Sequence, residues 1–92
     1  MSNRDDQSTV VVHSPVVGTV YRAAEPGGTP LCEVGDHVEA ETIVCVLEVM
    51  KLIVSVPAGV AGTVERLLFT NGSLVQEDQP LLVIRRNPAG SG

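Results

Sequence analysis

The chain has 92 residues, 43% of them hydrophobic, and a formal net charge of -5. This length suits one domain with a single core, and an acidic chain without a run of lysine or arginine excludes a phosphate-neutralising surface for nucleic acid. Cys32 and Cys45 are too few for a disulfide framework and have no partners at metal-ligand spacing, so we expect no metal site.

Both ends of the chain are polar or rich in Gly, Pro and Ser. We expect residues 1–8 and 87–92 to lack fixed structure and residues 9–86 to form the folded domain. The first residues contain no apolar segment typical of a signal peptide, and no apolar run approaches membrane-spanning length. We therefore expect a cytoplasmic protein that makes no contact with a membrane.

Short apolar segments separated by glycine, proline and asparagine follow one another through residues 9–86 and predict an all-β domain. Residues 9–22 align with residues 53–66, and seven of the fourteen aligned pairs are identical. Residues 34–47 align in the same way with residues 71–84. Such an internal repeat indicates two halves with one plan. We predict a flattened barrel or sandwich of two four-stranded antiparallel sheets with pseudo-two-fold symmetry.

Two local patterns refine this fold. Gly35 and Gly72 stand at equivalent places where a tight turn needs a positive φ, and Asn71 before Gly72 strengthens the turn signal. The apolar runs 43–47 and 81–84 lack a clean alternation of apolar and polar residues. We therefore expect both faces of these two strands to be covered.

The first half carries a seven-residue insertion between Arg22 and Val34, because its two blocks align with the second half at different offsets, 44 and 37 residues. The insertion lies within residues 23–31, which include two prolines and two glycines. This composition predicts a protruding loop. Lengthening a surface loop costs little, about 0.6 kcal/mol per doubling, so the loop alone indicates no function.

Residues 48–51 connect two apolar runs, 44–47 and 52–56, at the join of the two halves. Two strands joined by a tight reversal form a hairpin, which would hold the amine of Lys51 out at its tip. The pattern indicates a candidate modification site. An ordinary solvent-exposed lysine is the alternative, because lysine is mostly exposed in any fold.

The run Glu48, Val49, Met50 and Lys51, placed between two quasi-repeats, resembles the biotinyl-lysine hairpin of biotin carboxyl carrier domains, in the biotinyl/lipoyl-attachment family. The resemblance implies a biotin protein ligase that uses ATP to join biotin to Lys51 by an amide bond, with Glu48, Val49, Met50 and Leu52 as the recognised hairpin. It also implies a non-catalytic carrier, which shuttles carboxybiotin between a biotin carboxylase subunit and a carboxyltransferase subunit.

The insertion resembles the thumb of the carrier subunit of bacterial acetyl-CoA carboxylase, an enzyme of fatty acid biosynthesis. Its equivalents here, which we call the thumb loop, are Ala23, Ala24, Glu25, Pro26, Gly27, Gly28, Thr29 and Pro30. Those carriers often have a threonine at the first thumb position that hydrogen-bonds the ureido ring of biotin, where this chain has Ala23. Any grip of this loop on biotin would rely on other groups.

Two other functions fit parts of the pattern. A lipoyl carrier of a 2-oxoacid dehydrogenase complex would share the fold, but lipoyl hairpins typically have Asp before the lysine and Ala after it, where this chain has Met50 and Leu52. An unmodified β-domain used only for protein interactions is the third possibility.

Overall fold

The computed structural model describes residues 8–86, which form eight β-strands and no helix. The prediction of an all-β domain is confirmed. Of the two expected tails, residues 1–7 of the first and the whole of the second, residues 87–92, lie outside the described residues. The strands are β1 (Thr9–His13), β2 (Gly18–Tyr21), β3 (His37–Val38), β4 (Ile43–Val49), β5 (Leu52–Pro57), β6 (Gly62–Leu67), β7 (Ser73–Val75) and β8 (Pro80–Arg86).

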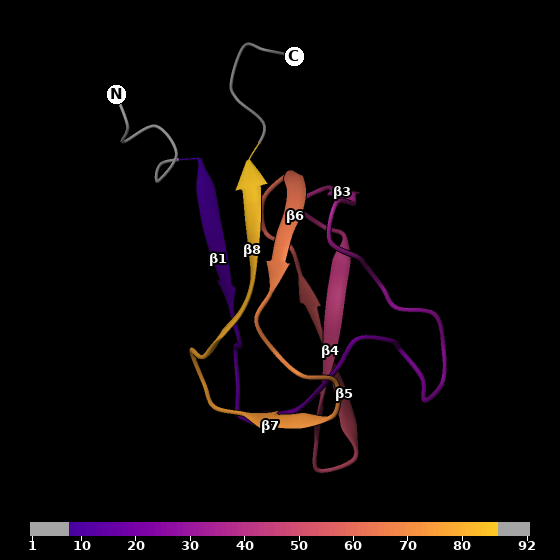
Figure 1. Cartoon of the computed structure of the whole chain (residues 1–92). Helices are drawn as coiled ribbons and strands as arrows, with labels where there is room; N and C mark the ends of the chain where they lie inside the picture. Colours follow the sequence, from indigo (N-terminus) through magenta and orange to yellow (C-terminus); the bar gives the residue numbers. More distant parts are fainter. Residues whose placement is uncertain (1–7, 87–92) are drawn as a thin grey trace.

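The strands form two four-stranded sheets (Figure 1). One sheet has the order β1-β8-β6-β3 and the other the order β5-β4-β2-β7, and every neighbouring pair is antiparallel. Each sheet keeps two edge strands, so the fold is a flattened sandwich and not a closed barrel. We call the two layers the β8 sheet and the β4 sheet.

The internal repeat of the sequence is visible in the strand order. Replacing each strand of the β8 sheet by its counterpart in the other half (β1 by β5, β8 by β4, β6 by β2, β3 by β7) gives the order of the β4 sheet. The predicted pseudo-two-fold plan is confirmed. Both turn glycines also behave as predicted, because Gly35 has φ 98° and Gly72 has φ 84°.

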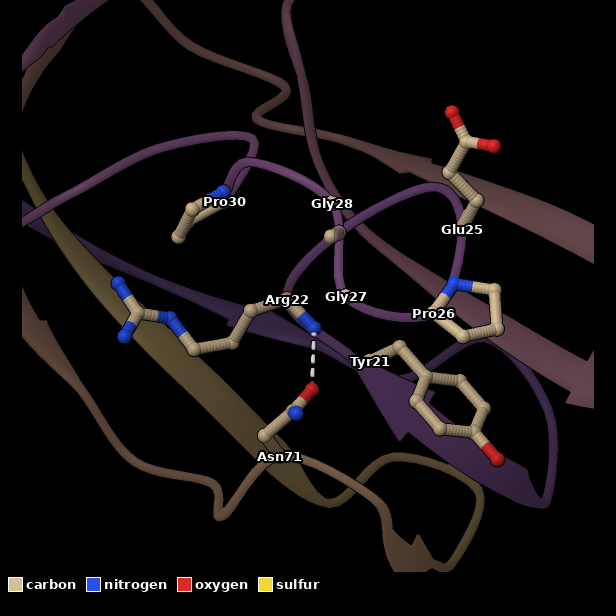
Figure 2. Close-up of a pocket in the computed structure, with 9 residues that line it drawn as sticks. Tyr21, Arg22, Glu25, Pro26, Gly27, Gly28, Pro30 and Asn71 are labelled. Carbon is tan, nitrogen blue, oxygen red and sulfur yellow. Dashed lines mark hydrogen bonds between the residues drawn. The ribbon is translucent and has the colours of Figure 1, made fainter.

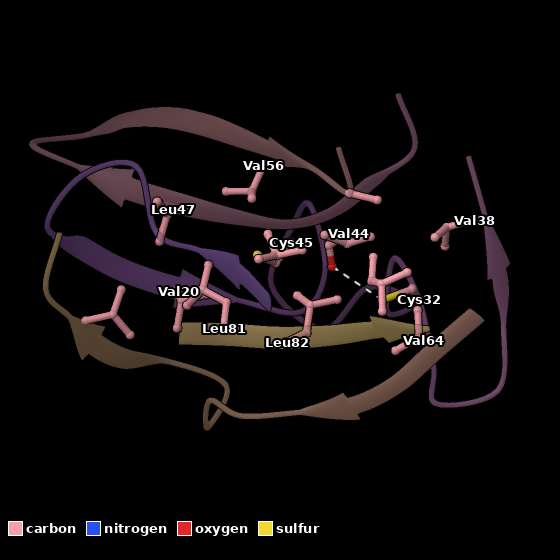
Figure 3. Close-up of a cluster of buried hydrophobic side chains, with 14 residues drawn as sticks. Val20, Cys32, Val38, Val44, Cys45, Leu47, Val56, Val64, Leu81 and Leu82 are labelled. Carbon is pink, nitrogen blue, oxygen red and sulfur yellow. Dashed lines mark hydrogen bonds between the residues drawn. The ribbon is translucent and has the colours of Figure 1, made fainter. Parts of the chain in front are cut away.

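The core lies between the two sheets and consists mainly of Val, Leu and Ile side chains (Figure 3). Val44, Cys45, Val46 and Leu47 of β4 are all buried, as expected for a strand covered on both faces. In β8, Leu81, Leu82 and Ile84 are buried and Val83 is half-buried. Residues on both faces of a strand are buried only where something covers the outer face as well. At Val46 of β4, residues 23–26 of the thumb loop lie beside that outer face.

The ends of the described chain lie far from the β4–β5 turn. The backbone N–H of Arg86 donates to the carbonyl of Ser8 at 2.6 Å, which ties the start of β1 to the end of β8. These strand ends and the β4–β5 turn are at opposite ends of the molecule (Figure 1). The turn is therefore free to meet another protein at one end of the sandwich. None of the described residues belongs to a helix of the length and apolarity that crossing a membrane requires.

Candidate functional site

Strands β4 and β5 form a hairpin closed by a two-residue turn. Their register runs from Cys45 opposite Val56 to Val49 opposite Leu52, which leaves Met50 and Lys51 as the two turn residues. Met50 has φ 52° and Lys51 has φ 72°. Positive φ at both central positions identifies a type I′ turn, whose twist matches the flanking strands. The sequence predicted this hairpin, and Lys51 lies at its tip.

Two bulky side chains in the left-handed region are an unusual way to build this turn. Type I′ turns favour Asn-Gly, Asp-Gly or Gly-Gly, since other residues are strained at positive φ. Met50 and Lys51 retain that strain although neither side chain is needed to form the turn. An outlier of this kind points to a function of the side chains themselves.

The side chains at the tip are open to solvent. Met50 is 89% exposed and Leu52 is 70% exposed, and Lys51 is exposed as well. Within residues 8–86, no hydrogen bond or ion pair engages the Lys51 amine. A rigid turn thus presents a primary amine next to an exposed apolar pair, an arrangement that another protein can grip without first ordering the chain.

The four predicted recognition residues do not form one surface. Val49 is half-buried and packs against the core, whereas Met50 and Leu52 are exposed. Glu48 is half-buried and pairs across the strands with Ile53 on one side and Thr19 on the other. Val49 therefore supports the turn from below, and only the others offer contact surface.

The thumb loop leaves the fold after β2 and returns before β3. The backbone N–H of Leu31 donates to the carbonyl of Arg22 at 2.7 Å, which closes the loop at its base. Near the tip, Gly28 N–H donates to the carbonyl of Glu25 at 3.0 Å, and Gly27 has φ 73°. The predicted loop exists as an ordered turn in this part of the chain.

The loop does not simply project into solvent, because it lies beside the outer face of the β4 sheet. A cavity of about 260 Å³ separates loop residues 23–26 from a floor made by Tyr21, Val46, Glu48 and Ile53. Val46 is only 3% exposed. We call this cavity the thumb cleft, and its floor reaches Glu48 and Ile53, the cross-strand pair directly below Val49 and Leu52.

A second cavity, of about 230 Å³, also lies against the thumb loop (Figure 2). Tyr21 and Pro26 line both cavities, and Figure 2 shows their rings in the wall of the second one. Gly27, Gly28 and Pro30 line only this second cavity, and Thr29 lines neither. Among the predicted thumb residues, Ala24 lines only the thumb cleft, whereas Ala23, Glu25 and Pro26 line both cavities.

Sequence reasoning missed the floor of the thumb cleft and the contacts at the base of the loop. Tyr21, Val46 and Ile53 come from three strands, and only the order β5-β4-β2 brings them together. Asn71 was identified as a turn residue alone, yet its side chain accepts a hydrogen bond from Arg22 N–H at 2.8 Å. No local sequence signal marks these partners.

The two thiols do not contribute a nucleophile. Burial, and then the neighbouring Cys32, raises the pKa of the Cys45 thiol to about 12. Burial is also the main cause that raises the pKa of Cys32, whose Sγ lies 3.6 Å from the Val44 carbonyl (Figure 3). Thiols with raised pKa values stay protonated near neutral pH and are inert. The described residues also contain no cluster of His, Cys, Asp and Glu that could hold a metal ion.

Comparisons with known proteins agree with this geometry. A family model described as "Biotin-requiring enzyme" matches residues 10–84. The chain is 47% identical over 74 residues to the biotin carboxyl carrier protein of acetyl-CoA carboxylase of Pseudomonas aeruginosa, covering 80% of this chain and 47% of that protein. It is 44% identical over 80 residues to the protein of the same name from Nostoc, covering 87% and 44%. The chain thus spans about half the length of these relatives.

Two solved structures are similar as well. Kluyveromyces lactis urea carboxylase matches with a TM-score of 0.70 and 32% identity, over 83% of this chain and 6% of that one. A single-chain, multi-domain long-chain acyl-CoA carboxylase matches with a TM-score of 0.73 and 26% identity, over 90% and 8%. The family model covers most of the chain and includes the whole β4–β5 hairpin. This chain belongs to the biotin/lipoyl family of biotin-requiring enzymes.

Proposed function

We propose that the chain is a biotin carboxyl carrier, which is biotinylated at Lys51 and serves a carboxylase acting on acetyl-CoA or another acyl-CoA. The observation that carries this proposal is the strained type I′ turn that presents the Lys51 amine at the tip of a rigid hairpin. The names of the relatives support biotin as the attached group. They also favour biotin over lipoate, as do Met50 and Leu52 beside the lysine.

The residues present fit a covalently attached biotin. An amide bond to the Lys51 Nζ needs an amine that is exposed and unengaged by its neighbours, and the turn supplies one. The bound biotin would supply the chemistry of carrying a carboxyl group, and this chemistry belongs to the cofactor. The chain itself supplies the attachment point, a defined direction at the tip of the hairpin, and the thumb cleft one cross-strand pair below it.

Three partners follow from this proposal. A biotin protein ligase would recognise the exposed Met50 and Leu52 and the half-buried Glu48, while Val49 holds the turn in place. A biotin carboxylase subunit would load the carboxyl group and a carboxyltransferase subunit would remove it. Tethering the cofactor raises its effective concentration at both enzymes, provided that the carrier can reach each of them. The chain would act as a carrier domain, with catalysis left to these partners.

Intact-mass measurement tests the proposal. The purified chain is incubated with ATP, biotin and a biotin protein ligase, and in parallel with ATP, lipoate and a lipoate ligase. We expect one biotinyl adduct, which peptide mapping places on Lys51, and little or no lipoyl adduct. Lipoylation without biotinylation would establish a lipoyl carrier instead. A chain left unmodified in both reactions would indicate an interaction domain.

A further inference from the structure

Arg22, at the end of β2, is hydrogen-bonded to two other segments at the base of the thumb loop. Its backbone N–H donates to Asn71 Oδ1 at 2.8 Å, as Figure 2 shows, and its carbonyl accepts from the Leu31 N–H at 2.7 Å. Its guanidinium Nη2 donates to the Cys32 carbonyl at 3.2 Å and to Glu33 Oε1 at 2.8 Å. One residue therefore joins the end of β2, the returning arm of the loop and the turn before β7.

The rest of the loop has few other fixed points. The returning arm is anchored in the core by Cys32, which is 3% exposed and contacts the Val44 carbonyl of β4. The tip itself holds one backbone hydrogen bond among the described residues, from Gly28 to Glu25. The position of residues 23–26 beside the β4 sheet thus depends on the base, where Arg22 links the outgoing arm to the anchored arm.

We propose that Arg22 is a positioning residue, which keeps residues 23–26 in place as the wall of the thumb cleft beside Glu48 and Ile53. The inference rests on the proposed function, because it assigns Arg22 a role in how the biotinylated hairpin meets its partners. A loop that is ordered in the free carrier spares the complex the conformational entropy of ordering it. Releasing Arg22 therefore weakens partner binding and leaves the chemical step unchanged.

The same nitrogen, Nη2, makes both side-chain contacts of Arg22. A lysine has one donor nitrogen of similar reach, so Arg22→Lys should keep the loop in place. Arg22→Met retains the apolar stem but leaves the Cys32 carbonyl without this donor, so it should release the loop. Glu33→Gln removes only the charge of an exposed partner and should release it partly. Arg66→Met, an exposed arginine of β6 in the other sheet, is the matched control.

Tyr21 can serve as an intrinsic spectroscopic probe of the loop. The chain has one tyrosine, Tyr21, and no tryptophan, and Tyr21 lines the thumb cleft. In Arg22→Met we expect a weaker near-ultraviolet circular dichroism signal from Tyr21, stronger quenching of its fluorescence by acrylamide, and faster hydrogen exchange at the Leu31 amide. Arg22→Lys and Arg66→Met should match the unsubstituted chain. Unchanged exchange at Leu31 in Arg22→Met would overturn the proposal, as would an equal loss in Arg22→Lys and Arg22→Met.

Kinetics with the biotinylated chain supply the functional readout. We expect Arg22→Met to raise the KM of biotin carboxylase for the carrier about three- to tenfold, with kcat changed less than about twofold. An unchanged KM, or a loss confined to kcat, would refute the positioning role. Ligation at Lys51 is measured first in every variant. It should not change, because the hairpin does not include the loop. Failure of the unsubstituted chain to accept biotin would refute the proposed function, whereas normal ligation with an unchanged KM would refute only the role of Arg22.

Discussion

The turn residues of the hairpin show a conflict between local preference and position. The sequence predicted a tight reversal at residues 48–51, but nothing in Met50 or Lys51 predicts a positive φ. The register of β4 and β5 places the two residues there, because Val49 pairs with Leu52 and leaves no other residue to turn the chain. The packing of the strands on the core thus holds a strained turn in place.

Replacing Met50 tests this strain. Met50→Asn places a residue that tolerates positive φ at the first turn position, and it gives up little burial because Met50 is exposed. We expect the free energy of unfolding to rise by about 0.5–1 kcal/mol in urea titrations. We also expect slower ligation of biotin at Lys51, since the exposed side chain of Met50 is a proposed ligase contact. No gain in stability would show that the turn is unstrained, and an unchanged ligation rate would remove Met50 from the recognised surface.

Replacing Lys51 separates its chemistry from its structural role. Lys51→Arg keeps the charge and a similar stem, so the exposed tip should not change in structure. We expect no biotin adduct by intact mass and a free energy of unfolding within about 0.5 kcal/mol of the unsubstituted chain. An adduct on the variant would move the acceptor to another amine. A large loss of stability would contradict the exposed position of the side chain.

Each repeat has a glycine at which a neighbouring strand approaches closely, and the two glycines occupy equivalent positions. A Cβ added at Gly18 of β2 would lie 2.9 Å from the Glu48 carbonyl and from Val49 of β4, and one added at Gly62 of β6 would meet the Arg85 carbonyl of β8. These contacts are equivalent by the repeat, and both glycines were aligned in the sequence. The alignment identified the positions, while the reason for glycine, the approach of a partner strand, is a property of the sheets.

Gly62→Ala tests this contact. We expect a loss of about 1–3 kcal/mol in the free energy of unfolding, because the methyl group meets backbone that cannot move aside without shifting β8. Thr63→Ala, the next residue along β6, is the control and should change stability far less. If alanine at position 62 were tolerated as well as alanine at position 63, the strands would not be in close contact there.

The thumb loop was predicted as a protruding connection, and the structure adds that it covers part of the β4 sheet. Deleting residues 24–30 should leave the hairpin and its ligation nearly unchanged, since Lys51 lies outside the loop. We expect a loss of about 1–2 kcal/mol, because the deletion uncovers Val46 on the floor of the thumb cleft. Urea unfolding and ligation rates measure the two effects. Complete unfolding would show that the loop is part of the core, and no loss at all would show that Val46 is covered by other groups.

Because of the buried thiols, the stability of the whole domain varies with pH in the alkaline range. The folded state raises the pKa of Cys45 to about 12, against about 8.5 for a thiol in an unfolded chain. Above about pH 8.5 the folded state therefore binds a proton that the unfolded state has lost, and stability falls as the pH rises toward 12. The loss from Cys45 is about 1.4 kcal/mol per pH unit in this window. Below the window its contribution is constant.

Cys45→Val isolates this effect, because valine fills a similar buried volume and does not titrate. The free energy of unfolding is measured by urea titration under reducing conditions at about pH 8, 9 and 10, which span the start of this window. We expect it to fall less steeply with pH in the variant than in the unsubstituted chain. Equal slopes would show that the Cys45 thiol ionises in the folded chain as readily as in the unfolded one.

Much of the fold follows from the sequence by itself. The repeat of residues 9–22 in residues 53–66 determined the two halves, and the turn glycines Gly35 and Gly72 marked the turns that precede β3 and β7. Residues 48–51 determined the place of Lys51, the proposed acceptor. These features are local or are repeated along the chain, so alignment of the chain with itself reveals them. The rest of the site could not be predicted in this way, because it forms only when the strands are arranged in the two sheets.

Only the tertiary structure decided how the hairpin and the thumb loop meet. The thumb cleft joins Tyr21, Val46 and Ile53, which the sheet order β5-β4-β2 brings together from distant parts of the chain. The positive φ of Met50 and the bonds of Arg22 to Asn71 and Glu33 arise in the same way. Local propensity carries no information on such contacts, since each depends on the register and packing of strands that are remote in sequence.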